Sequence, residues 1–237
     1  MITPEQKQKL IENNKKISAL MKDNETIIRE AGYNPPETNF ALQEDEKINI
    51  PSAYIRPKEY LNKTHHLEEI AETWEKRSNI AYALQWSDFY NFLINRFHFY
   101  GSLKTMIFKS AIINVVSIIE SIILECANNI CNRPVSCHQN NCQYKFNKEQ
   151  RANVMKALLR MNELEITDFT KEELERISYI VDCRNKVHIR LSKEKEIFSE
   201  SFDLPIYNEA IIFLKKLCEQ INKNGTRIYH TCDFVIE

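Results

Sequence analysis

The stretch D-C-R-N-K-V-H-I-R, residues 182–190, places an arginine and a histidine on the apolar face of a predicted helix. Arg184 and His188 continue a stripe of apolar residues spaced by three and four positions, which is the spacing of one helix face. A guanidinium without a partner costs roughly several kcal/mol in an apolar core. The pattern therefore predicts one of two arrangements: an ion pair inside the protein, with Glu120 as the candidate partner of Arg184, or a wet cleft that holds both side chains.

Two segments of the chain resemble the HEPN superfamily of small helical-bundle domains. One is the pentapeptide R-N-K-V-H at residues 184–188, and the other is the apolar run S-A-I-I-N-V-V-S-I-I-E-S-I-I at residues 110–123. The resemblance covers roughly residues 64–223, and its specific part is the pentapeptide. It implies a domain of the kind found in toxin–antitoxin, abortive-infection, antiviral-defence and RNA-processing proteins.

The resemblance also implies an activity, a metal-independent endoribonuclease in which two protomers bring their motifs together across a dimer cleft. His188 would transfer protons around the attacking ribose 2′-hydroxyl and the leaving 5′-oxygen. Arg184 would bind the scissile phosphate and stabilise the transition state, and Asn185 would orient Arg184 or form a hydrogen bond across the dimer. Lys186 and Arg190 would hold flanking phosphates of the RNA. The expected products are a 2′,3′-cyclic phosphate and a 5′-hydroxyl, with no cofactor and no metal.

The spacing of the pentapeptide leaves a second function open. Three residues separate Arg184 from His188, whereas the superfamily usually has four to six. At about 100° of rotation per helical residue, the two side chains lie ~40° apart, whereas one further residue would place them ~140° apart. The alternative is a non-catalytic HEPN-like module that binds RNA or a partner protein, such as an antitoxin or another defence-system protein.

The rest of the chain predicts an all-α protein, an up-and-down helical bundle that is HEPN-like by the resemblance and carries an N-terminal helical extension. Helical periodicity covers residues 3–31, 64–100, 103–130, 147–162, 170–191 and 205–223. Only three glycines occur, fewer than a turn-rich β fold needs. We assign residues 1–60 to the N-terminal helix and an irregular linker, 61–225 to the bundle with a cysteine-containing loop at 131–146, and 226–237 to a tail with strand-like alternation.

Two side-chain patterns bear on the core and the site. Aromatic residues recur at helical spacing between Trp74 and Tyr100, and we interpret them as core rather than as a ligand cage. The next predicted helix carries a polar stripe on one face, formed by Asn114, Ser117, Glu120 and Ser121. The stripe is either a solvent-facing or helix-packing surface or a polar wall that faces a site. We favour the first interpretation because amphipathic helices need a polar side.

The composition indicates a cytoplasmic protein that does not span a membrane. The formal net charge of −1 argues against binding of nucleic acid over the whole surface but allows a local RNA site. Seven cysteines, an odd number, without an export signal indicate reduced thiols. The longest apolar run is interrupted by polar residues such as Asn114 and Glu120, which makes a membrane span unfavourable.

A group of soft metal ligands is concentrated around the predicted loop at 131–146. The group consists of Cys126, Cys131, Cys137, His138 and Cys142. Four such ligands can close a tetrahedral zinc site, but the C-x2-C spacing that specifies one is absent. We therefore expect free thiols and no metal, with a structural zinc as the alternative.

Overall fold

The structure of the chain, a computed structural model, describes residues 3–30, 43–50, 52–132, 146–185 and 202–230. No β-strand occurs within these ranges, which confirms the all-α prediction. The α-helices are α1 (Pro4–Glu30), α2 (Lys58–Thr64), α3 (Leu67–Ile70), α4 (Trp74–Arg96), α5 (Gly101–Asn132), α6 (Lys148–Ala152), α7 (Val154–Glu163), α8 (Lys171–Asn185) and α9 (Leu204–His230). Two short 3-10 helices, η1 (Glu44–Glu46) and η2 (Ser52–Tyr54), precede α2.

The chain divides into two units, Met1–Ser52 and Ala53–Glu237. The first contains α1, and the second contains α2 to α9. The sequence placed this boundary at residue 60, whereas α2 already packs against α4 and so belongs to the second unit.

Short polar side chains set the helix starts that the sequence predicted. Thr3 accepts a hydrogen bond from the backbone N–H of Gln6 at 3.2 Å and so caps α1 ahead of Pro4. Thr170 caps α8 in the same way, through the N–H of Glu173 at 3.2 Å.

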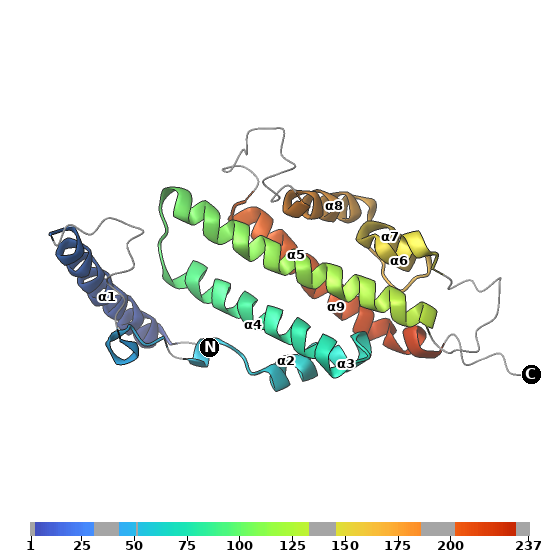
Figure 1. Ribbon diagram of the computed structural model, residues 1–237, viewed down its shortest axis with the longest axis horizontal. Helices are drawn as coiled ribbons and strands as arrows, with labels where there is room; N and C mark the ends of the chain where they lie inside the picture. Colours follow the sequence, from blue (N-terminus) through green and yellow to red (C-terminus); the bar gives the residue numbers. More distant parts are fainter. Residues whose placement is uncertain (1–2, 31–42, 51, 133–145, 186–201, 231–237) are drawn as a thin grey trace, which may run out of the picture. The chain divides into compact units, whose positions relative to one another are not determined.

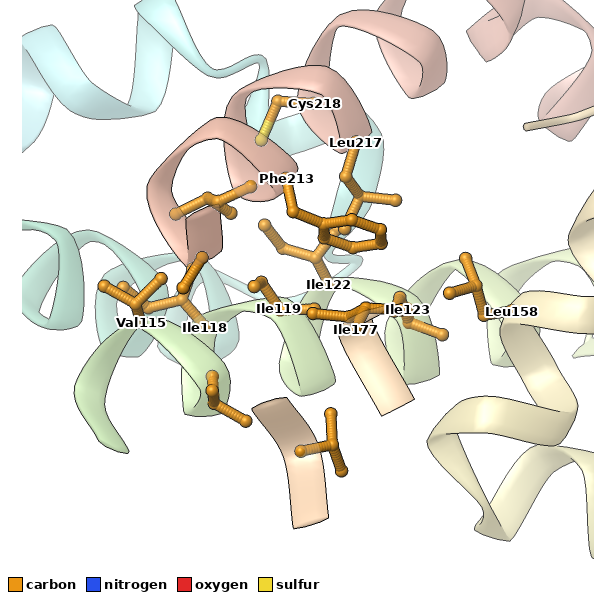
Figure 2. Close-up of a cluster of buried hydrophobic side chains, with 14 of the residues drawn as sticks. Val115, Ile118, Ile119, Ile122, Ile123, Leu158, Ile177, Phe213, Leu217 and Cys218 are labelled. Atoms are coloured by element: carbon orange, nitrogen blue, oxygen red, sulfur yellow. The ribbon is translucent and has the colours of Figure 1, made fainter. Parts of the chain in front are cut away.

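α5 is the central helix of the second unit. It contacts α4, α7, α8 and α9, and Figure 1 shows α4 and α8 on opposite sides of it with α9 running alongside. Its isoleucines and valines at 115, 118, 119, 122 and 123 are at most 1% exposed. Figure 2 shows these side chains meeting Leu158 of α7, Ile177 of α8 and Phe213 of α9. Burial of aliphatic side chains from four helices against α5 is therefore what orients α8.

The region predicted as one helix over 64–100 is divided among three helices in the structure. α2 ends at Thr64, α3 covers only Leu67–Ile70, and α4 ends at Arg96. His66 at φ 49° sits in the left-handed region between α2 and α3, a conformation that no helix interior accommodates. The predicted helix at 147–162 is likewise divided into α6 and α7, because Asn153 has an extended backbone and caps α7.

The prediction that the aromatic residues between Trp74 and Tyr100 form the core is wrong. None of them is buried, and Trp74, Trp86 and Tyr100 are 68%, 55% and 77% exposed. The face of α4 that packs on α5 carries Ile80, Ala81 and Leu84, and Tyr90 is half-buried against the same core. Helical spacing shows which residues share a face but cannot say which face the protein covers.

The last helix is longer than predicted. The sequence ended it before Gly225 and suggested a strand in the tail, whereas α9 continues to His230. Residues 231–237 lie outside the described part of the chain. A single glycine costs a helix only about 1 kcal/mol, which is too little to end it.

Candidate functional site

Arg184 lies in the last turn of α8, on the face that packs against α5. The preceding residues of this face, Ile177 and Val181, are 1% and 4% exposed. The side chain of Arg184 is 33% exposed. The predicted stripe is therefore buried up to Val181 and reaches the edge of the core at Arg184, where the guanidinium is partly in water.

Glu120 of α5, the candidate that the sequence offered, forms an ion pair with Arg184. The Nη2 atom of Arg184 lies 3.4 Å from the Oε2 atom of Glu120, and the Glu120 side chain is 17% exposed. This distance is longer than the 2.7–2.9 Å of a close charge-assisted hydrogen bond. The contact is therefore an ion pair rather than a close hydrogen bond.

The pKa of the Glu120 carboxyl reflects two opposing effects, burial and the charge of Arg184. Burial raises the pKa of the Glu120 carboxyl above its usual value of 4.5, and the charge of Arg184 lowers it by less. Desolvation of the carboxylate thus outweighs its attraction to the arginine, as is common for half-buried pairs. α8 packs on α5 through apolar side chains such as Ile177 and Val181, and the ion pair lies at the edge of this contact.

The other predicted site residues are at or beyond the end of the described helix. Asn185 is the last residue of α8, and its side chain is outside the described part of the structure. Lys186, His188 and Arg190 lie outside the described residues altogether. The part of the candidate site that the structure describes is thus an arginine and its carboxylate at one end of α8.

The polar stripe on α5 serves two different neighbours. Asn114 donates hydrogen bonds at 2.9 Å to the carbonyl of Ala83 and to the hydroxyl of Ser87, both on α4. Ser117 bonds within its own helix, to the carbonyl of Ile113. Glu120 meets Arg184 on α8. The stripe is mainly a helix-packing surface, and only Glu120 belongs to the candidate site.

Some of the candidate zinc ligands lie within the described part of the structure, and the others lie outside it. Cys126 is fully buried in the core of α5, and burial raises the pKa of its thiol. Cys131 lies in α5 with its side chain undescribed, and Cys137, His138 and Cys142 lie outside the described ranges. Among the side chains that the structure does describe, no group of three or more His, Cys, Asp or Glu could hold a metal.

A second polar cluster, which the sequence analysis missed, joins the segment before α2 to α4. Arg56 donates to both carboxylate oxygens of Asp88, with Nη2 to Oδ1 at 2.7 Å and Nε to Oδ2 at 2.9 Å. The backbone N–H of Arg56 also donates to Asp88 Oδ2 at 3.0 Å. Asp88 is 8% exposed, so this fork satisfies a nearly buried charge. The sequence feature that could have indicated this cluster is Asp88, an acidic residue within an aromatic segment.

A cavity of 220 Å³ adjoins this cluster. Its lining residues are Tyr54, Asp88, Asn91, Phe92, Asn95 and Arg96. The rings of Tyr54 and Phe92 pack with centroids 4.2 Å apart, and Tyr207 of α9 donates to Asn91 Oδ1 at 2.8 Å. The cavity is smaller than the ~300–1,000 Å³ of pockets that enclose drug-sized ligands.

The chain matches no protein-family model, no curated protein and no solved structure. By length and composition, the Gly101–Ile130 segment of α5 qualifies as a membrane span, although 50% of its most apolar window is buried inside the protein. Such burial is typical of the central helix of a bundle, and the contacts of α5 with α4, α7, α8 and α9 account for it.

Proposed function

We propose that the chain is a metal-independent, HEPN-like endoribonuclease of a toxin or anti-phage defence type. The observation that carries the proposal is Arg184, a partly exposed arginine in the last turn of α8 whose Nη2 atom lies 3.4 Å from the Oε2 atom of Glu120 on α5. A partly exposed guanidinium at the end of a helix can present its planar set of donors to a phosphate. The pentapeptide resemblance supplies the reaction.

Arg184 also takes part in interactions other than the pair with Glu120. The proposal therefore rests on the partial exposure of its side chain and on the 3.4 Å separation of the pair, and it requires no unpartnered arginine. In this proposal Arg184 binds the scissile phosphate, Asn185 orients the guanidinium, and His188 transfers the protons. Lys186 and Arg190 hold the flanking phosphates.

The enzyme of this proposal is a cytoplasmic homodimer in which two copies of the motif form one composite site. RNA is the substrate, and an antitoxin or another defence-system protein is the regulatory partner. Cleavage by attack of the ribose 2′-hydroxyl leaves a 2′,3′-cyclic phosphate and a 5′-hydroxyl. It requires a proton acceptor and a proton donor, which two histidines of a dimer would supply.

A non-catalytic HEPN-like module that binds RNA or a protein is the second candidate. It is favoured by the pair itself, because Glu120 already offers Arg184 a negative charge within the same chain. The short arginine-to-histidine spacing favours it as well, since it departs from the usual pattern of the superfamily. In this case the pentapeptide stabilises the end of α8 and shapes a binding surface.

The decisive experiment compares wild type with His188→Ala on total RNA in the presence of EDTA. General acid–base catalysis contributes roughly 10²–10⁴-fold, so the variant should lose at least about a hundredfold in cleavage rate. End-labelling of the fragments should show 5′-hydroxyl ends. The matched control is His98→Ala, since His98 is exposed and lies outside the candidate site.

Two outcomes would contradict the enzyme. Cutting that persists in His188→Ala, or that EDTA abolishes, would remove the proposed chemistry. Absence of cutting by wild type on all RNA tested would favour the non-catalytic module. Arg184→Lys adds a second test, because lysine keeps the charge but lacks the planar fork. Its control is Arg176→Lys on the same helix, where the guanidinium pairs with Glu209.

A further inference from the structure

α1 carries an apolar stripe that is exposed along its length. None of its residues is buried, and Ile17, Leu20 and Ile27 are 50%, 63% and 62% exposed. A helix of 27 residues is about 40 Å long. Most helical stability in proteins comes from packing of an amphipathic face, and exposed apolar patches of this kind mark interaction surfaces.

The stripe follows the heptad pattern of a coiled coil. Positions a are Leu10, Ile17 and Asn24, and positions d are Asn13, Leu20 and Ile27. Apolar side chains spaced alternately by three and four residues form the seam between two helices. One asparagine lies in each half of the seam, and buried asparagines need a polar partner across it.

We propose that α1 pairs with α1 of a second copy of this chain, as a short antiparallel coiled coil. In this arrangement the a position of one helix faces a d position of the other. Ile17 then packs against Leu20 of the second copy, and Asn13 meets Asn24 of the second copy. Both asparagines obtain an amide partner, and the apolar layers remain apolar.

The charges beside the seam select the antiparallel direction. The g positions are Lys9, Lys16, Asp23 and Glu30, so one half of this edge is basic and the other half acidic. In an antiparallel pair g faces g, which sets Lys16 against Asp23 and Lys9 against Glu30 of the second copy. In a parallel pair Lys16 would face Met21 and gain no opposite charge.

This inference concerns residues 4–30 alone and does not rest on the proposed ribonuclease. It would hold for a chain that never cuts RNA, and a ribonuclease could exist without it. Where both hold, the pairing of α1 raises the effective concentration at which two second units meet.

The first test measures the dimer dissociation constant of the full chain by analytical ultracentrifugation. Leu20→Asp places a charge in the seam and should raise this constant at least about a hundredfold. Ala19→Asp is the matched control, because this neighbouring residue points away from the seam and should leave the constant unchanged. A monomeric wild type, or equal constants for the two variants, would overturn the proposal.

The second test addresses direction by charge reversal. Lys16→Glu and Asp23→Lys should each weaken the dimer about tenfold, because each converts two attractive pairs into repulsive ones. The double variant should recover the wild-type constant, since it exchanges the two charges between the helices. Failure of the double variant to recover would reject the antiparallel arrangement.

Discussion

Glu120 is the residue whose environment most clearly departs from that of a surface carboxylate. Burial raises its pKa, and Arg184 opposes that rise. A carboxyl whose pKa is higher in the folded than in the unfolded protein favours folding when it is protonated. Its contribution to stability is therefore present below the usual pKa and is lost as the pH rises through the folded pKa.

Replacement of Arg184 should make the stability of the protein more dependent on pH. Arg184→Met removes the charge that lowers the pKa of Glu120, so this pKa rises further. The variant should lose more unfolding free energy than wild type between about pH 4 and pH 7, and Glu120→Gln should lose less. Urea unfolding at a series of pH values measures this difference.

A control and a contrary result are both available for this prediction. Glu175→Gln changes an exposed carboxylate of the same helix and should leave the pH profile as in wild type. An Arg184→Met profile that coincides with that of wild type would show that Arg184 does not act on Glu120 electrostatically.

At the scale of elements, the fork between Arg56 and Asp88 fixes the start of the second unit. Arg56 precedes α2, and Asp88 lies in the middle of α4. Four hydrogen bonds from Arg56 to this carboxylate hold the segment before α2 against α4. The segment that carries Arg56 accordingly belongs to the second unit, which begins at Ala53.

Loss of the carboxylate should therefore destabilise the second unit. Asp88→Asn keeps the shape but leaves the Arg56 fork with one neutral acceptor, and a loss of about 1–3 kcal/mol is expected. The measurement is chemical denaturation followed by circular dichroism. Asp182→Asn, at an exposed position of α8, is the control and should remain within about 0.5 kcal/mol of wild type. Equal stabilities would show that the fork is energetically neutral.

At the scale of the whole molecule, the described thiols report on the integrity of the core. Cys126, Cys183 and Cys218 are buried and free. Burial raises the pKa of Cys126 and raises that of Cys218 to about 12. The thiolate is the reactive form of cysteine, so burial makes all three thiols inaccessible, and the raised pKa also keeps Cys126 and Cys218 protonated.

The rate of thiol alkylation should therefore distinguish the folded from the unfolded protein. Iodoacetamide at about pH 8 should modify these three thiols at least about a hundredfold more slowly in the native protein than in urea. Mass spectrometry of peptides gives the rate at each cysteine. Rapid native modification of Cys126 would contradict its place in the centre of α5.

The sequence by itself determined the helical class, most helix starts and the buried stripe of α8. These features depend on local chemistry: Thr3 and Thr170 cap the helices that follow them, and Ile177 and Val181 recur at the spacing of one helix face. Glu120 was one candidate partner of Arg184 in the sequence, and the structure shows the two side chains as an ion pair.

Only the tertiary structure decided which face of each helix is buried against neighbouring helices. Helical spacing predicted the aromatic residues of α4 as core, but Ile80 and Leu84 pack against α5 and the rings of Trp74, Tyr82 and Trp86 are exposed. The fork between Arg56 and Asp88 joins residues 32 positions apart, and no local pattern encodes such a contact. Periodicity fixes the angle between side chains around one helix, whereas burial depends on the shape and volume of the neighbouring helices.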